Sequence, residues 1–221
     1  MRPFEEEFEL LNETLQEMGA LVACSVHKSV FALIDKNEDY AHQVLRDESR
    51  IDQMEIQIDD LAASLIVREQ PVARDMRFVV VAIKINTDLE RMGDLAVNIV
   101  ERSLSLMRQP GLPESVNFIE LANLVESMVL SSLDAFVKRD IQIARGVLAS
   151  DDAVDKCRNS IQQQVLTLMQ RDPSAITRAV DHLIIARSLE RIGDHATNIA
   201  EDIIFMVQGI DVRHQRAGEA A

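Results

Sequence analysis

Acidic side chains recur at helical spacing in a segment that the chain contains twice. LERMGDLAVNIVE at residues 89–101 returns as LERIGDHATNIAE at residues 189–201, with nine of the thirteen positions identical. A helix turns by about 100° per residue, so the two acids, the asparagine and the final glutamate of each copy fall on one face, opposite the apolar positions. These residues are Glu90, Asp94, Asn98 and Glu101 in the first copy and Glu190, Asp194, Asn198 and Glu201 in the second.

A second pair of acids, again four residues apart, precedes each copy. The two pairs are Glu48 with Asp52, and Asp151 with Asp155. The first pair continues along its helix with Glu55 and Asp59, whereas Arg158 and Gln162 stand at the matching positions of the second half. The first half is therefore predicted to hold the richer acidic site.

Repeated rows of carboxylates point to cation binding. Like charges four residues apart destabilise a helix by roughly 0.2–0.5 kcal/mol per pair, and a bound multivalent cation removes this repulsion. Carboxylate and amide oxygens, without a thiolate or a convergent histidine, suit Mg, Ca, Mn or Fe better than a tetrahedral structural Zn site. The same residues also permit a solvated helix face that is supported by neighbouring ion pairs. The residues alone leave both interpretations open.

Two other residue types accompany the acids. Glycine costs a helix about 1 kcal/mol relative to alanine, yet Gly93 and Gly193 stand beside the acids in both copies. A glycine at this place suggests that another group approaches the backbone closely. His195 has Leu95 as its counterpart and falls toward the core side of the helix, so we expect it to be packed and not to bind metal.

The elements that position these acids are predicted to be helices. Apolar residues recur at spacings of three and four over residues 4–34, 44–66 and 76–107, and the low content of glycine, proline and aromatic residues favours helix over sheet. The prolines and glycine of residues 108–114 interrupt the pattern, which then resumes. The helices predicted for the second half cover residues 115–137, 151–170 and 173–207, with Pro173 as a first helical residue.

The fold class predicted from this order is all-α. The chain reads as a tandem duplication of a three-helix unit, and short loops make the neighbouring helices of each bundle antiparallel. We expect two antiparallel three-helix bundles. The predicted units are a first bundle at residues 1–108, a linker at 109–114 and a second bundle at 115–221.

Composition excludes several classes of protein. Lys plus Arg is 23 and Asp plus Glu is 37, so the net charge of -14 repels nucleic acid and anionic lipid. The N-terminus has no apolar signal region and the longest purely apolar run is residues 78–83, so we expect no membrane insertion. Cys24 and Cys157 are isolated, which suits a reducing compartment. These features together predict a cytoplasmic protein that does not bind nucleic acid.

Catalytic motifs are missing from the sequence. It contains no phosphate-binding loop, dinucleotide fingerprint, hydrolase elbow or zincin motif, and no Glu-x-x-His pair of the kind that di-iron bundles use. The chain is therefore interpreted as a binding protein and not as an enzyme. The alternatives are a helical scaffold or adaptor with solvated acids and, with less support, a carboxylate-bridged metalloenzyme.

The doubled Glu-Arg-(Met/Ile)-Gly-Asp motif, with Asn four residues after the Asp, resembles the PhoU family over essentially the whole chain. The resemblance implies a cytoplasmic, commonly dimeric negative regulator of phosphate uptake and of the phosphate-starvation response. Its implied partners are the phosphate ABC transporter and the sensor histidine kinase at the cytoplasmic face of the membrane. Neither nucleic acid binding nor membrane insertion is implied.

The resemblance also implies a ligand set, because family members bind metal through these acidic motifs. Carried over by motif, the metal is a divalent or ferric ion, with Fe, Mn, Mg and Zn as candidates. Asn98, Glu101, Asn198 and Glu201 are candidates to join the motif acids. The implied ligands that belong to the motifs themselves are Glu48, Asp52, Glu90, Asp94, Asp151, Asp155, Glu190 and Asp194. Arg158 and Gln162 depart from this pattern and make the two sites unequal.

Overall fold

The computed structural model describes residues 3–69, 73–112 and 116–212. Within these residues the chain forms six α-helices and one short 3-10 turn, which confirms the predicted all-α class and the two three-helix bundles. The first bundle contains α1 (Pro3–Ile34), α2 (Glu38–Glu69) and α3 (Ala73–Met107). The second contains α4 (Ile119–Lys138), α5 (Ile141–Arg171), the 3-10 turn η1 (Pro173–Ala175) and α6 (Ile176–Gln208).

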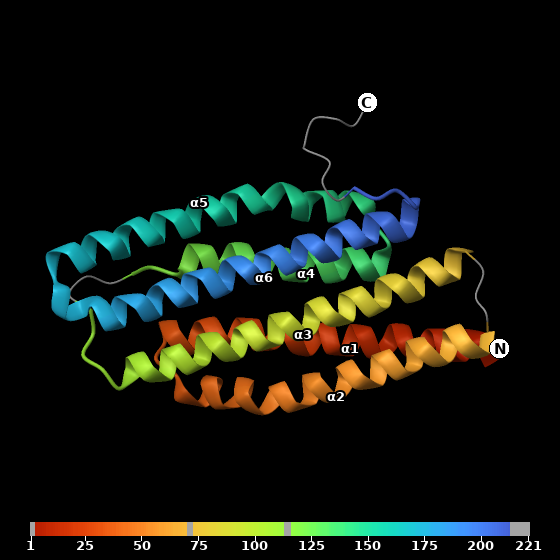
Figure 1. Cartoon of the computed structure of the whole chain (residues 1–221), viewed down its shortest axis with the longest axis horizontal. Coiled ribbons are helices and arrows are strands. Elements are labelled where there is room, and N and C mark those ends of the chain that lie inside the picture. The colour runs from red at the N-terminus through yellow and green to blue at the C-terminus, as the bar shows by residue number, and fades with distance from the viewer. Residues whose placement is uncertain (1–2, 70–72, 113–115, 213–221) are drawn as a thin grey trace.

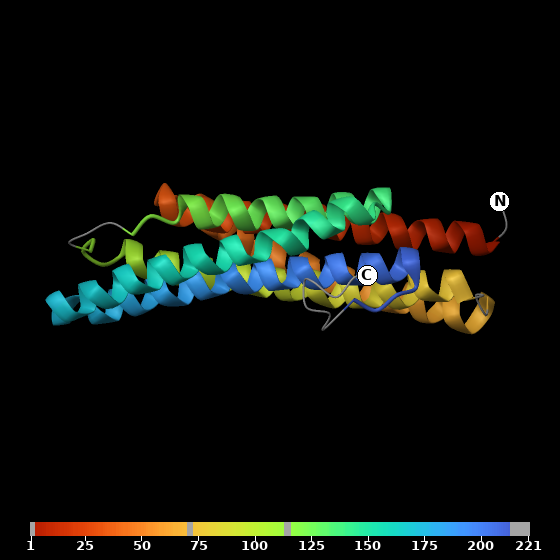
Figure 2. The same ribbon diagram turned by 90° about the horizontal axis from the view of Figure 1, so that it is seen from above.

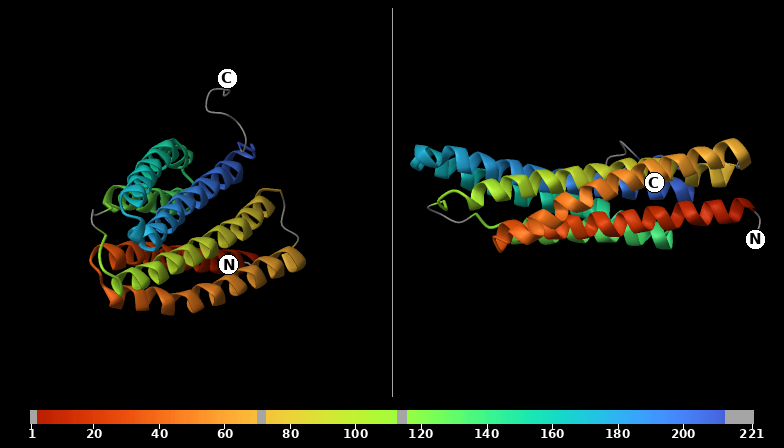
Figure 3. Two further views of the ribbon diagram at one scale, coloured as in Figure 1. Left: turned by 60° about the vertical axis from the view of Figure 1, so that its left-hand side comes forward. Right: turned by 90° about the horizontal axis from the view of Figure 1, so that it is seen from below.

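The helices lie in two layers. In one layer α2, α3, α6 and α5 lie side by side, and Figure 1 shows this order from bottom to top. The other layer consists of α1 and α4, which contact each other and cover the first layer from one side (Figure 2). Each bundle keeps its three helices closely aligned along the long axis of the molecule (Figure 3). The helices that carry the repeated segment, α3 and α6, are thus the central pair that joins the bundles.

Helix α1 owes its apolar composition to the core of the first bundle. It packs against α2, α3 and α4, and its buried positions recur every three or four residues. By length and composition alone, residues 6–34 would suffice to cross a membrane, but core helices of folded bundles pass the same test. The large fully buried apolar side chains of α1 include Leu11, Leu15, Met18, Val22 and Val26.

All three helix starts of the second bundle differ from the sequence predictions, and α4 begins at Ile119, four residues later than predicted. The prediction for α5 was wrong by ten residues, because the helix begins at Ile141 and not at Asp151. Asp140 caps it by accepting from the backbone N–H groups of Gln142 and Ile143, a signal that the exposed Gly146 had obscured. The prediction for α6 was also wrong, because Pro173 begins the 3-10 turn η1 and α6 follows from Ile176.

The structure describes the predicted linker only in part. Residues 113 and 114 of the linker lie outside the described residues. Described linker carbonyls at Pro110 and Gly111 both accept hydrogen bonds from Nη1 of Arg178, each at 2.8 Å. These bonds tie the linker to the start of α6. The bounds of the two units stay predictions.

Buried charged side chains join α3 to α6. We call this contact between the two bundles the seam. Asp88 is 8% exposed and accepts a hydrogen bond from Nδ1 of His195 at 2.7 Å. Lys84 donates to Asp202 at 2.5 Å nearer one end of the seam. His195 is therefore a packed residue of the seam, as its position on the helix predicted.

Candidate functional site

The acids of α2 and α3 come together because the two helices pack closely. A Cβ atom built on Gly93 would lie 3.2 Å from Cδ1 of Ile51, which is a buried residue of α2. The matching glycine of α6, Gly193, faces Val154 of α5 at 3.5 Å. The group that approaches each glycine is thus an apolar side chain of the neighbouring helix. This contact brings the acidic rows of the paired helices close to each other.

Seven carboxylates of the first bundle form what we call the first acidic cluster. Its members are Glu48, Asp52, Glu55 and Asp59 on α2 and Glu90, Asp94 and Glu101 on α3. Burial raises the pKa of Glu48, and the charges of Asp52, Asp94 and Glu101 raise it further. Within the described residues no ion pair joins a cation to this cluster.

Glu90 is the most strongly perturbed member of the first acidic cluster. Partial burial raises its pKa from 4.5 to about 7, and the negative charges of Asp94 and Glu55 together with a hydrogen bond to Asp94 add to the effect. The same causes, burial followed by the charge of Asp59, raise the pKa of Glu55. Folding therefore holds these carboxylates together against their repulsion, which is the condition that a bound cation would relieve.

Two asparagines of α3 border the cluster with unused oxygens. Asn86 is fully buried, and its Nδ2 donates to the backbone oxygen of Glu55 at 3.0 Å and to Oδ1 of Asp59 at 3.1 Å. Among the described residues, Oδ1 of Asn86 and Oδ1 of Asn98 are both buried without a hydrogen-bond partner. Such orphaned acceptors call for a donor or an ion.

A surface hollow adjoins the same helix. It has a volume of about 310 Å³, and its walls include Asp94, Asn98 and Glu101 of α3 with Arg91 and Arg191 at its edges. Three of the four residues that the sequence placed on one face of this helix therefore line one concavity. The predicted stripe of α3 is a real surface feature.

The second bundle brings together a smaller group, which we call the second acidic cluster. Its members are Asp151 and Asp155 on α5 and Glu190 and Asp194 on α6. Burial raises the pKa of Asp151, and the charges of Asp155 and Glu190 raise it further. Burial likewise raises the pKa of Asp194, with Glu190 as the next cause.

A cation belongs to the second acidic cluster. Nη2 of Arg158 donates to Oε1 of Glu190 at 2.6 Å, and the two side chains are only 26% and 17% exposed. Nη1 of the same guanidinium donates to Oε1 of Gln162 at 3.0 Å. The departure seen in the sequence thus places a positive charge against one of the predicted ligands.

The remaining predicted ligands of the second bundle differ in their surroundings. Nδ2 of Asn198 donates to Oδ1 of Asp88 across the seam at 3.2 Å, so its amide is engaged by the first bundle. Glu201 lies on the same helix and is partly exposed. The asparagine and final glutamate of the motif therefore do not play equivalent parts in the two copies.

The donor types of the first acidic cluster fit an oxygen-seeking cation. In the part of the chain that the structure describes, no three Asp, Glu, His or Cys side chains converge closely enough to hold an ion in their present positions. Side-chain rotation on the helix surface would be needed, which exposed carboxylates undergo readily. The second acidic cluster fits such a cation poorly because Arg158 already neutralises Glu190.

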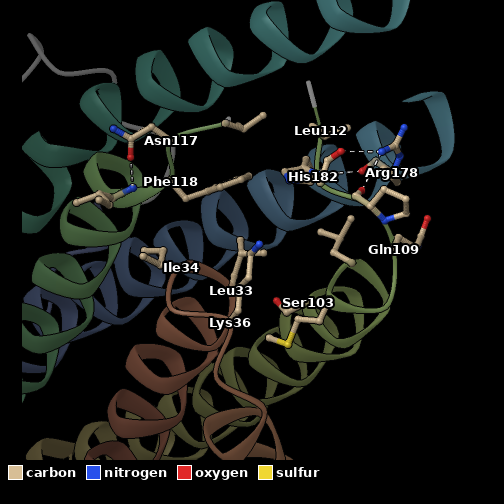
Figure 4. A pocket seen from close by; sticks show the side chains of 16 residues that line it. Leu33, Ile34, Lys36, Ser103, Gln109, Leu112, Asn117, Phe118, Arg178 and His182 are labelled. Atoms are coloured by element: carbon tan, nitrogen blue, oxygen red, sulfur yellow. Dashed lines mark hydrogen bonds between the residues drawn. The ribbon is translucent and has the colours of Figure 1, made fainter. Parts of the chain in front are cut away.

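A separate cavity lies where the linker meets the ends of α1, α3 and α6. Figure 4 shows this space of about 520 Å³, bordered by Leu33, Ile34 and Phe118, with Arg178 bonded to the linker. No carboxylate of either acidic cluster lines it. The cavity reflects how the linker closes over the bundle ends and is separate from the acidic sites.

Comparison with known proteins gives a consistent likeness. The PhoU domain matches the chain twice, over residues 15–103 and 118–203. The phosphate-specific transport system accessory protein PhoU homolog of Pseudomonas aeruginosa is 39% identical over 212 residues, covering 96% of this chain and 88% of that protein. The homolog from Caulobacter vibrioides is 36% identical and covers 98% of this chain and 94% of the relative.

Solved structures extend the likeness to the fold. The crystal structure of PhoU from Pseudomonas aeruginosa superposes with a TM-score of 0.91 at 38% identity, covering 94% of this chain and 100% of that one. The phosphate transport system regulatory protein PhoU from Streptococcus pneumoniae gives a TM-score of 0.86 at 26% identity, covering 95% and 99%. Both bundles and their arrangement are shared across this range of identity.

Proposed function

Because the chain belongs to the PhoU domain family, we propose that it is a negative regulator of phosphate uptake and of the phosphate-starvation response. The observation that carries this proposal is the likeness over nearly the full length to accessory proteins of the phosphate-specific transport system. In this role the chain is a cytoplasmic homodimeric adaptor between the phosphate ABC transporter and the sensor histidine kinase. It acts by binding one state of a partner more tightly than another, and it catalyses no reaction.

The proposal includes a divalent or ferric metal ion at the first acidic cluster. Support comes from carboxylates that folding brings together without a cation, and from the buried acceptor oxygens of Asn86 and Asn98. Glu48, Asp52 and Glu90 with Asp94 would hold the ion. When bound, the ion supplies positive charge that neutralises the carboxylates of α2 and α3. The packing of α2 against α3 holds these carboxylates together.

Arg91 and Arg191 are candidates for residues that contact a partner. Both are exposed, and they come from the two copies of the repeated motif to border one hollow beside the acids. A partner that docks here would meet both arginines and, with metal bound, neutralised carboxylates beside them. Regulation would then depend on the state of the first acidic cluster.

A deletion and complementation experiment tests the proposed role. In a bacterium that lacks its own PhoU-family protein, phosphate-starvation genes should be active in phosphate-rich medium, and expression of this chain should repress them. Cross-linking followed by capture from membranes of phosphate-replete and phosphate-starved cells should recover the transporter and the kinase in different amounts. Failure of this chain to repress, at a level of expression that matches a functional relative, would refute the proposed role.

A further inference from the structure

We infer that the guanidinium of Arg158 replaces the metal ion in the second bundle, so that the chain binds metal only in the first. This inference rests on the proposed metal binding of the first acidic cluster. It concerns the second acidic cluster, to which the family motif alone would assign an equal metal site. The second acidic cluster contains all four motif acids, yet one of them, Glu190, is paired with a cation from the chain itself.

The guanidinium of Arg158 is held in place by side-chain oxygens. Nη2 lies 2.6 Å from Glu190, and Nη1 is held by Oε1 of Gln162 at 3.0 Å and Oδ1 of Asn159 at 2.7 Å. A planar guanidinium that is already held by two acceptors loses little further freedom when it pairs with a carboxylate. The pair is also mostly shielded from water, which limits its screening. Glu190 therefore has a permanent partner.

The two halves of the chain carry different charges at the positions of this ion pair. Arg158 stands 103 residues after Glu55, and Glu190 stands 100 residues after Glu90. In the first bundle the corresponding residues are two acids, and the negative charge of Glu55 helps to raise the pKa of Glu90. The repeated architecture thus places like charges at these positions in the first bundle and opposite charges in the second.

Two further exchanges lie beside this ion pair. Gln162 stands where the first bundle has Asp59, and Ala186 stands where it has the buried Asn86. Asn86 joins Glu55 to Asp59 across α2 and α3 in the first bundle, and an alanine cannot make such bonds. At these three positions the first bundle has two acids and an amide, with net negative charge. The second bundle has an arginine, an amide and an alanine, with net positive charge.

The energetic consequence follows from competition. A metal ion in the second acidic cluster must displace the guanidinium from Glu190 or bind beside an uncompensated positive charge. The first of these costs is absent from the first acidic cluster, because within the described residues no ion pair occupies its carboxylates. The second bundle should accordingly gain less stability from added metal than the first bundle does.

Metal titration of the full chain tests the inference. With metal-stripped protein and Mn²⁺ as the probe, calorimetry should show binding that Glu90→Ala with Asp94→Ala removes and that Glu190→Ala with Asp194→Ala leaves intact. Arg158→Glu should add a second set of Mn²⁺ sites. The reverse exchange, Glu55→Arg, should weaken binding in the first bundle by about 10–100-fold. Mn²⁺ binding that is lost with Glu190 and Asp194 in the otherwise unchanged chain would overturn the inference.

A measurement without metal separates this inference from the proposed function. In chelator, Arg158→Gln should lower the melting temperature by about 2–4 °C because Glu190 loses its partner, while the matched Glu55→Gln should raise it. If the chain binds no Mn²⁺ but these opposite shifts appear, the metal proposal fails and the role of Arg158 as counter-ion stands. If Arg158→Gln leaves the melting temperature unchanged, the counter-ion role itself is refuted.

Discussion

Removal of the charge at Glu90 should stabilise the metal-free protein, and the gain should depend on pH. The folded state raises the pKa of this carboxyl from 4.5 to about 7. A carboxyl whose pKa is raised by folding opposes folding wherever it is ionised, so the penalty is complete above the folded pKa and vanishes below the unfolded one. Stability therefore falls as pH rises from about 4.5 to 7.

The size of the effect follows from the same values. One pKa unit corresponds to about 1.4 kcal/mol, and solvent screening of this partly exposed group reduces the full difference to about 1–3 kcal/mol. Glu90→Gln should raise the free energy of unfolding by that amount at pH 8 and by only about a quarter of it at pH 5. Glu190→Gln is the matched control, because Arg158 neutralises Glu190 and its loss should not stabilise the protein.

Urea unfolding of both variants in chelator at pH 5 and pH 8 gives these free energies. The expected pattern is a pH-dependent gain for Glu90→Gln alone. An equal gain at both pH values would show that the substitution acts through packing and not through charge. An equal gain in the two variants would refute the claim that the clusters differ in their electrostatic balance.

The other consequences of the structure can be tested by thermal or urea unfolding. Chelator should lower the melting temperature and added Mn²⁺ should restore it, beyond the effect of a salt control of equal ionic strength; identical melts would leave the acids as a solvated face. Gly193→Ala should stabilise the protein by about 0.5–1 kcal/mol, whereas Gly93→Ala should gain less or lose stability because the new Cβ presses on Ile51 at 3.2 Å; equal gains would contradict the close packing of α2 and α3. His195→Leu should cost about 1–3 kcal/mol by leaving Asp88 underpaired in the seam, and adding Asp88→Ser should recover part of the loss, since the matching positions of the repeat carry leucine and serine; no recovery would argue against the buried pair as the cause.

The repeat and the apolar spacing were sufficient to predict the fold. Helix period and the doubled motif established two three-helix bundles, and Gly93 signalled a close approach that Ile51 supplies. Helix starts were less predictable, because the Asp140 cap precedes a stretch in which Gly146 disturbs the pattern. Local signals of this kind compete, and tertiary packing decides between them.

The candidate site was predicted in part. The spacing on one helix placed Glu90, Asp94 and Glu101 together. The acids of α2 come near them only through the packing of α2 against α3. Asn86 lies four residues before Glu90 but was not predicted as a site residue. The prediction relied on positions that recur in both copies, and the counterpart of Asn86 is Ala186. The engagement of Asn198 by Asp88 depends on the seam between bundles, for which one sequence carries no direct signal.

The central claim is that regulation depends on the first acidic cluster and not on the second. The most direct measurement is the activity of a phosphate-starvation reporter in phosphate-rich medium, in cells that carry this chain as their PhoU-family protein. Glu90→Ala with Asp94→Ala should leave the reporter active while circular dichroism shows that the purified variant keeps its helices, and Glu190→Ala with Asp194→Ala should still repress it. Full repression by the folded first-cluster variant would contradict the account.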